Sequence, residues 1–258
     1  MRDPIGGARP TERFTDRVAD YDRWRPGYPP EVLGVLRRET GLRPGRIVAD
    51  VGSGTGLLAQ VFLDHGNVVL GVEPNAAMAE AAVRRFAGRA FHDVRGTAEA
   101  TTLPEDSVDL VAAGQAFHWF EPAAAAAELR RILKPDGSAA IVWNRRRLSG
   151  TPFLAAYEAF LQRWGTDYRA VSERYADPAA LRVFFGGQSF AHHRFANAQE
   201  LDLEGLRGRL LSSSYTPAPG HPDHEPMLAA LPALFAAHAA GGRVRFEYDT
   251  DLYVGPLR

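Results

Sequence analysis

The residues best suited to chemistry lie in a glycine-rich turn directly after an apolar run, Asp50-Val-Gly-Ser-Gly-Thr-Gly56. Glycines let a backbone approach a ligand closely, and a helix that follows points its free N–H groups at that ligand. A second acid, Glu73, ends the next apolar run, 17 positions past Gly56. A carboxylate in that place can accept hydrogen bonds from both hydroxyls of a ribose. The two features together indicate a nucleoside site.

The spacing of the glycines distinguishes between kinds of nucleoside. Dinucleotide-binding loops carry G-x-G-x-x-G, and the pyrophosphate beside them gives no reason for an acid just before the first glycine. Here the loop carries G-x-G-x-G, and Asp50 stands two residues before Gly52. A carboxylate there suits a cationic ligand, such as one with an ammonium and a sulfonium. An NAD-dependent oxidoreductase is therefore disfavoured, and so is an ordinary strand-to-helix turn.

Short apolar runs alternate with helical stretches through the first 145 residues and must position these acids. Near-continuous apolar strands that alternate with helices predict a parallel sheet covered on both faces, so the expected fold class is α/β. The expected strands are 46–51, 67–72, 91–94, 108–113 and 138–143, and the expected helices are 57–65, 76–86 and 122–133. Asn75 is the expected cap of the second helix, and Lys134-Pro-Asp-Gly137 is the expected stop of the third, feeding a tight turn.

The alternation stops after Asn144. Two helical stretches, at 152–164 and 178–185, with no strand between them predict a helical cap inserted at 145–187. The elements expected after it are a strand at 189–197, helices at 203–212 and 225–240, and a strand at 243–253. In that last strand charged and apolar residues alternate, which predicts an antiparallel edge strand with one wet face.

Composition excludes several classes of function. The chain has 30 Lys+Arg, 31 Asp+Glu, 45% apolar residues and no cysteine. We therefore expect no nucleic-acid partner, no disulfide scaffold, no Cys-ligated zinc and no thiol nucleophile. No apolar run approaches the ~18 residues of a membrane span, and the first ten residues do not resemble a signal sequence, so we expect a cytoplasmic protein without a membrane partner. The dominance of Arg over Lys, with much Ala, Gly and Pro, is typical of GC-rich bacterial genomes.

At these motifs the sequence resembles the class I S-adenosylmethionine-dependent methyltransferases, in particular the methyltransferase type 11 group that includes trans-aconitate-methyltransferase-like proteins. The matching motifs are Asp50 to Gly56, Gly71-Val-Glu-Pro-Asn75 with Met78, Gly96-Thr-Ala-Glu99, Gln115-Ala-Phe-His-Trp-Phe120 and Leu133-Lys-Pro-Asp-Gly137. Residues 21–29 look like the family's lid segment. The resemblance implies a doubly wound, mostly parallel seven-stranded sheet with an antiparallel last strand. It also implies a single domain over 1–258 with a lid at 1–30, S-adenosylmethionine as cofactor and S-adenosylhomocysteine as product.

The resemblance also implies which residues contact the cofactor. They are Tyr21, Arg25, Asp50, Gly52, Ser53, Gly54, Thr55, Gly56, Glu73, Pro74, Asn75, Met78, Thr97, Ala98, Gln115 and Ala116. The glycine loop would wrap the methionine part, Asp50 would hold its amino group, Glu73 would hold the ribose, and the residues from 74 to 98 would flank the adenine. Tyr21 and Arg25 would reach the cofactor carboxylate. Many relatives carry Asp at the position of Thr97, as the acceptor for the adenine amino group. Thr97 would either accept through its hydroxyl or leave that role to the backbone.

The segment Gln115 to Phe120 follows a strand at the carboxyl edge of the sheet, where α/β folds place their active sites. His118 is its one side chain able to take a proton near neutral pH. Two roles stay open for it: a general base, or a histidine that orients the loop. A carboxylate or amine nucleophile needs no base, so His118 would matter only for hydroxyl or carbon acids. The absence of Asn/Asp-Pro-Pro-Tyr here argues against methylation of DNA or of glutamine side chains.

The expected function is methyl transfer to a small molecule through an oxygen, carbon or nitrogen nucleophile. The alternative is a non-methylating enzyme or a regulatory cofactor-binding protein on the same fold. No metal site is expected, because His192-His193 and His221 with His224 lie in different elements and lack a known ligand spacing.

Substrate choice is expected to depend on the lid and the cap. The aromatic residues of the cap are Phe153, Tyr157, Phe160, Trp164, Tyr168, Phe184 and Phe185. They would exclude water and favour an apolar or planar acceptor. The alternative is that they form the core of a helical insert, since their spacing from Phe153 fits one helix face. Ser212 to Tyr215 would either line the substrate pocket or end a helix.

Overall fold

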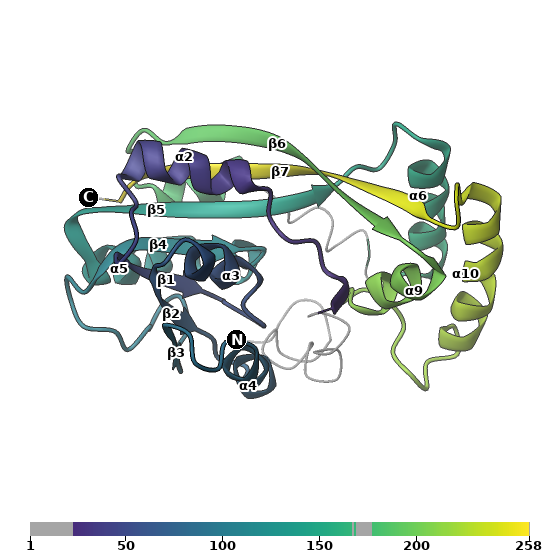
Figure 1. Ribbon diagram of the computed structural model, residues 1–258, viewed down its shortest axis with the longest axis horizontal. Helices are drawn as coiled ribbons and strands as arrows, with labels where there is room; N and C mark the ends of the chain where they lie inside the picture. The colour runs from purple at the N-terminus through teal and green to yellow at the C-terminus, as the bar shows by residue number, and fades with distance from the viewer. Residues whose placement is uncertain (1–22, 167, 169–176, 258) are drawn as a thin grey trace.

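The computed structural model describes residues 23–166, 168 and 177–257, in which one seven-stranded sheet is covered by helices on both faces (Figure 1). The strands are β1 Ile47–Val51, β2 Val68–Val72, β3 Phe91–Val94, β4 Val108–Gly114, β5 Leu133–Arg146, β6 Ala191–Leu201 and β7 Val244–Pro256. Their order is β3-β2-β1-β4-β5-β7-β6. The first five strands pair in parallel, and β7 is antiparallel to both of its neighbours. The predicted fold class, including the antiparallel last strand, is confirmed.

Helices on the two faces bury the alternate side chains of the same strands. α2 Pro30–Thr40, α3 Leu57–Asp64 and α4 Ala76–Arg85 pack on one face, and α5 Pro122–Ile132 and α8 Pro178–Phe184 pack on the other. In β4, for example, Leu110 faces the first layer and Val111 faces the second. A strand buried on both faces has no polar position to alternate with, which explains the continuous apolar runs of the sequence.

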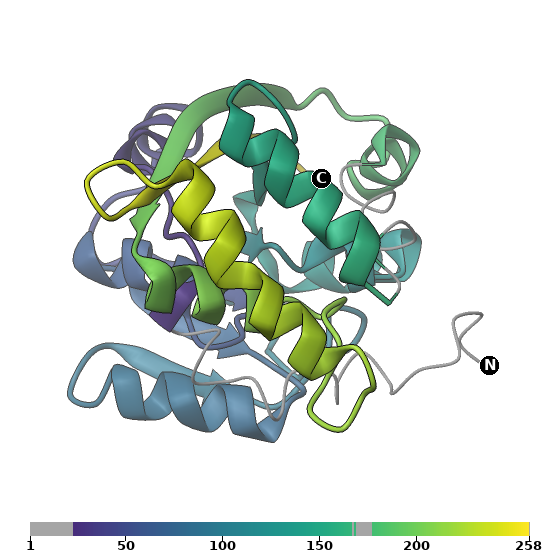
Figure 2. The same cartoon turned by 90° about the vertical axis from the view of Figure 1, so that its right-hand side faces the viewer.

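A third hydrophobic cluster lies at one end of the sheet. The strands β5, β6 and β7 reach beyond the shorter parallel strands toward α6 Pro152–Trp164, α9 Leu203–Leu211 and α10 His224–His238 (Figure 1). α6 and α10 lie side by side across this end, with α9 against α10 (Figure 2). The cluster buries apolar side chains of these helices against the first residues of β7. We call this part of the molecule the end lobe.

The position of β7 corrects one expectation from the sequence. β7 was expected at an edge of the sheet, but β6 pairs with it along its whole outer side, so β7 is an interior strand and β6 is the edge. The charged side chains of β7 are also not all exposed to solvent. Asp251 is buried and pairs with Arg145 of β5 and Arg194 of β6. The predicted wet face is present from Arg243 to Asp249, where charged side chains are exposed or half-buried, and it ends at Asp251, whose carboxylate is buried in ion pairs across the strands.

Two boundaries also differ from expectation. The run Lys134-Pro-Asp-Gly137 lies within β5 instead of forming a separate tight turn. Val108 pairs with Leu133 and Leu110 pairs with Ser138, so these four residues bulge from the strand. β5 then continues through Arg146, so it takes up the first two positions of the cap expected at 145–187, whereas the helices expected at 152–164 and 178–185 are present as α6 and α8. The expected N-cap is confirmed: Asn75 accepts a hydrogen bond from the Met78 backbone N–H at 3.1 Å.

Candidate functional site

The glycine loop joins β1 to α3 at the carboxyl edge of the parallel strands. The backbone N–H groups of Gly52 and Ser53 donate to the carbonyl of Val72, at 2.8 and 3.2 Å, which fixes the loop to the end of β2. Gly52, Gly54 and Gly56 all have positive φ, at 69°, 55° and 86°. A Cβ atom on Gly52 would lie 2.5 Å from Cβ of Ala116. Only glycine allows this backbone to pack so closely against the segment after β4.

Asp50 supplies a buried carboxylate beneath this loop. It is 1% exposed, and neither carboxylate oxygen has a hydrogen-bond partner among the described residues. Burial raises the pKa of Asp50 to about 7. The backbone N–H of Ala59 opposes the rise without reaching hydrogen-bond geometry, and the Glu73 charge adds to it. A buried carboxylate without a partner favours binding of a cation.

Two hydroxyl groups of the same loop are also buried without a hydrogen-bond partner among the described residues. Ser53 Oγ and Thr55 Oγ1 are buried and lack a hydrogen-bond partner in the part of the chain that the structure describes. Buried polar groups are normally hydrogen-bonded, and exceptions call for an explanation such as a ligand. With Asp50, these groups fit the polar, cationic amino-acid end of S-adenosylmethionine.

Glu73 ends β2 and holds the loop from the side. Its Oε2 accepts from the Gly54 N–H at 2.9 Å, and its Oε1 accepts from the Asn75 N–H at 2.8 Å. Burial raises the pKa of Glu73, while the two backbone donors partly counter the rise. An ionised carboxylate has about four acceptor positions. Glu73 can therefore position the loop and still accept from the hydroxyls of a ribose.

The residues expected around the adenine lie at the start of α4 and in the turn after β3. Pro74 is exposed, whereas Asn75 and Met78 are buried. Met78 Sδ approaches the glycine loop, 3.5 Å from where a Cβ of Gly54 would be. Thr97 is exposed and forms a tight turn with Ala100, and Ala98 beside it is buried.

The segment after β4 is held by hydrogen bonds from Gln115. This residue has a φ of 58°, and its side chain bonds the backbone of Asn144 through both Oε1, at 2.9 Å, and Nε2, at 3.2 Å. The Gln115 side chain is therefore occupied by β5, and the parts left to face a ligand are its backbone and Ala116. His118 lies in the short helix η2 Phe117–Trp119, and its ring contacts that of Trp119 at 4.6 Å.

Residues 23–29 cross the same end of the sheet, and we call them the strap. The Asn144 side chain donates to the carbonyls of Pro26 and Gly27, at 3.3 and 3.0 Å, and Asn197 donates to Gly27 at 2.9 Å. Arg25 Nη2 donates to the carbonyl of Ser212 at 2.7 Å, so this end of its side chain is directed at the end of α9. Tyr21, the other residue expected at the cofactor carboxylate, lies outside the described residues.

The contact that fixes the strap to the end lobe was not predicted from the sequence. The Trp24 ring lies against two glycines of α9, and a Cβ atom would come within 2.9 Å of it from Gly205 and 2.0 Å from Gly208. Gln199 of β6 adds a hydrogen bond to the Trp24 carbonyl at 3.2 Å. Two glycines three residues apart in a helix were the only available signal of such a contact.

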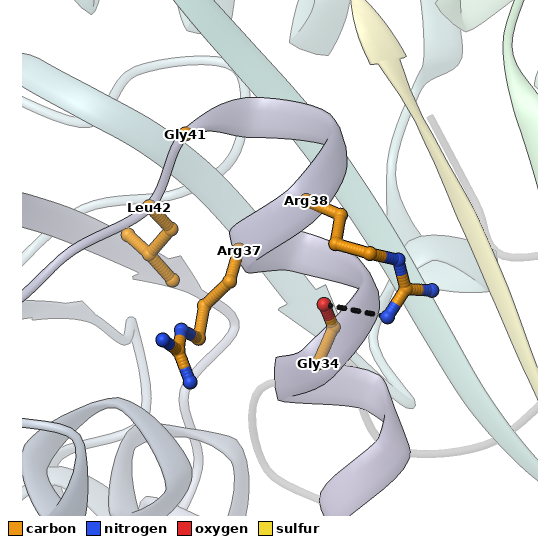
Figure 3. Close-up of a pocket in the computed structure, with 5 residues that line it drawn as sticks. All are labelled: Gly34, Arg37, Arg38, Gly41 and Leu42. Carbon is orange, nitrogen blue, oxygen red and sulfur yellow. Dashed lines mark hydrogen bonds between the residues drawn. The ribbon is translucent and has the colours of Figure 1, made fainter.

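Other residues singled out in the sequence lie away from the loop. His192 is hydrogen-bonded to Asp251 at 2.8 Å, and His193 Nε2 lies 2.6 Å from Glu39 Oε1. No group of three potential metal ligands occurs within the described residues. A hollow of about 430 Å³ lies on α2, lined by Gly34, Arg37, Arg38, Gly41 and Leu42 (Figure 3). It contains none of the expected site residues. No helix of the described chain is long and apolar enough to span a membrane.

The cap aromatics are buried in two clusters. Phe153, Tyr157 and Phe160 of α6 pack in the end lobe, and the Tyr157 ring meets the Phe246 ring edge-on at 4.8 Å. Phe184 and Phe185 belong instead to the cluster between α5, α8 and the sheet. This geometry favours the alternative that these residues are packing core.

Comparisons with known proteins identify the family of this chain. The profile of a methyltransferase domain family matches residues 49–141. An uncharacterized methyltransferase of Schizosaccharomyces pombe is 30% identical over 202 residues, 78% of this chain and 77% of the relative. An uncharacterized methyltransferase of Mycobacterium tuberculosis is 39% identical over 133 residues, 52% of each chain.

Solved structures share the fold. A SAM-dependent methyltransferase from Geobacter sulfurreducens, in complex with S-adenosyl-L-homocysteine, has a TM-score of 0.54 at 20% identity and covers 95% of this chain and 97% of its own. One from Thiobacillus denitrificans, also with S-adenosyl-L-homocysteine, has a TM-score of 0.54 at 19% identity, covering 94% and 97%.

Proposed function

This chain belongs to the S-adenosylmethionine-dependent methyltransferases, and from that premise we propose that it methylates a small-molecule acceptor through an oxygen, carbon or nitrogen nucleophile. The observation that carries the proposal is a group of buried polar atoms at the glycine loop, from Asp50, Ser53 and Thr55, that have no hydrogen-bond partner among the described residues. They lie beside Glu73, whose carboxylate already orders the loop. This combination suits a ligand with both a cationic amino-acid part and a ribose.

The bound cofactor supplies an electrophilic methyl group on a sulfonium, which is transferred by in-line displacement. In the proposal Asp50 holds the ammonium group, the glycine loop allows close approach of backbone, and Glu73 accepts from the ribose hydroxyls. Such a reaction depends chiefly on alignment in a site from which water is excluded. The strap and the segment of η2 are the elements that would close over the loop.

His118 is the proposed base where the acceptor is a hydroxyl or a carbon acid. It lies in η2, directly after the segment that packs on Gly52. With a carboxylate or amine acceptor no base is needed, so a variant without the imidazole would keep its turnover.

Two measurements test the proposal in sequence. Calorimetry with S-adenosylmethionine, S-adenosylhomocysteine and NAD should show binding of both sulfur nucleosides and none of NAD. The protein is then incubated with S-adenosylmethionine and separate pools of small acids, phenols and amines, and release of S-adenosylhomocysteine is recorded. Tight binding of NAD alone would refute the assignment. Cofactor binding without turnover on any pool would favour the regulatory alternative.

A further inference from the structure

A buried cluster of arginines and tyrosines lies in the end lobe and has no part in the proposed cofactor site. Arg146 of β5, Arg209 of α9 and Tyr248 of β7 belong to it, together with Tyr157 and Tyr215. The Arg209 guanidinium lies 6.0 Å from the ring centres of both Phe246 and Tyr248. The end lobe is therefore an apolar cluster that encloses a group of buried arginine and tyrosine side chains.

The two arginines differ in how their charge is compensated. Arg146 forms an ion pair with Glu158 and also donates to the Tyr168 hydroxyl at 2.7 Å. Arg209 donates to the Tyr248 hydroxyl and to Ser213 Oγ, each at 3.1 Å, and both partners are neutral. No carboxylate among residues 23–166, 168 and 177–257 pairs with Arg209, although the residue is only 5% exposed. Within that part of the chain Arg209 is a buried cation held only by neutral groups, an arrangement that is costly without an anion and is typical of a functional site.

The surroundings of Tyr215 show the same excess of positive charge. Burial would raise the pKa of this phenol, but Arg209, Arg146 and Arg25 together lower it below its ordinary value. Arg25 belongs to the strap, so the positive field extends from the buried cluster to the segment that crosses the sheet end.

The cluster is also connected to the strap by hydrogen bonds. Arg209 donates to the Tyr248 hydroxyl, Tyr248 donates to Gln199 at 2.8 Å, and Gln199 donates to the Trp24 carbonyl. Arg146 stands two residues past Asn144 in β5, which is about 7 Å farther along the strand. The cluster thus lies beyond the carboxyl end of the parallel strands, where ligands bind in α/β folds.

We propose that Arg209 is the anchor for an anionic group, a carboxylate or a phosphate, on the methyl acceptor. The proposal rests on the proposed function, since it names the chemical class of its substrate. The Arg209 fork can donate two parallel hydrogen bonds to such a group, and Ser213 and Tyr215 provide polar contacts beside it. This selects acceptors with an anionic end in place of the apolar or planar acceptors that the cap aromatics suggested.

The experiment measures anion binding to the full chain saturated with S-adenosylhomocysteine. Malonate and inorganic phosphate are titrated separately at constant ionic strength, with sodium chloride as the reference salt, and binding is followed by calorimetry and by the melting temperature. We expect one of the two probes to bind in the millimolar range, and Arg209→Gln to weaken it by at least about tenfold. Arg209→Lys keeps the charge without the fork and should give an intermediate loss. The matched control is Arg245→Gln, which removes an exposed arginine of β7 and should leave the affinity unchanged.

Three outcomes would overturn the proposal. The parent could bind neither probe better than chloride, or Arg209→Gln could bind as well as the parent. In the third outcome, the parent shows tyrosinate absorbance near neutral pH and Tyr215→Phe does not. Tyr215 would then be the internal counter-ion of Arg209. If Arg209→Gln does not fold, the proposal is tested by the affinity of the parent for the two probes and by the loss of affinity in Arg209→Lys. Binding of S-adenosylhomocysteine is measured on every variant, so its absence from the parent refutes the proposed function separately from the anion site.

Discussion

Cofactor binding should depend on pH through Asp50. The carboxyl has a pKa of about 7 in the ligand-free protein, because it is buried and lacks a hydrogen-bond partner among the described residues. A bound ammonium requires the ionised form. Binding below pH 7 must therefore expel a proton, and affinity should fall as pH decreases.

The expected size follows from the fraction of ionised Asp50. With a pKa of about 7, affinity at pH 5.5 should be roughly 25-fold weaker than at pH 7.5, a loss of about 1.9 kcal/mol. The range stops at pH 7.5 because an α-amino group of the ligand itself loses its proton near pH 7.7–8.0.

The assay is calorimetry with S-adenosylmethionine across this range in two buffers of different ionisation enthalpy, which also counts the protons released. Asp50→Asn should bind weakly and lose the pH dependence. Asp109→Asn is the matched control, because Asp109 pairs with Lys134 and has a lowered pKa. Asp109→Asn should show the same dependence of cofactor affinity on pH as the parent. Equal affinity of the parent at pH 5.5 and 7.5, or an unchanged slope in Asp50→Asn, would refute the reasoning.

The same group predicts an opposite effect on stability. The pKa of Asp50 is raised on folding from 3.8 to about 7, so ionisation destabilises the ligand-free fold increasingly as pH rises from about 4 to 7. The difference corresponds to as much as about 4 kcal/mol above pH 7. Asp50→Asn should therefore unfold at higher denaturant concentration than the parent at pH 7.5, and the gain should vanish below pH 4.

Other substitutions test the remaining parts of the site. Glu73→Ala removes an acceptor from two backbone N–H groups and should weaken cofactor binding by about 1–3 kcal/mol in calorimetry, and unchanged affinity would contradict the ribose assignment. Gly208→Ala should displace Trp24, seen as a change in tryptophan fluorescence and faster proteolysis near the strap, whereas an unaltered spectrum would show that the ring has room. Phe160→Ala should lower the free energy of unfolding by about 3–5 kcal/mol and leave the cofactor Kd of the folded protein unchanged, with Trp164→Ala as a less buried comparison.

The glycine loop could be predicted because its signals are local. The positive φ of Gly52 and the cap at Asn75 are properties of a few consecutive residues, and the sequence carries them directly. The parallel sheet was predictable for a similar reason, since burial on both faces leaves a continuous apolar run.

The missed features depend on partners distant in the sequence. The pattern of β7 was compatible with an edge strand until β6 was seen to cover it. The charge of Arg209 is unusual only because the fold buries it and pairs it with no acid in the part of the chain that the structure describes. Likewise Asn144 ends an apolar strand like many polar residues, and nothing nearby shows that the strap will meet it.

The place of β7 between β5 and β6 has a consequence for synthesis of the protein. β5 ends at Arg146 and its antiparallel partner begins at Val244, 98 positions later. At roughly 5–20 residues per second, the ribosome needs about 5–20 s to supply that partner. Throughout this interval the nascent chain carries an unpaired edge with Ile141 and Trp143, a template for association with other chains. Chaperone demand during translation should therefore be concentrated between completion of β5 and emergence of β7.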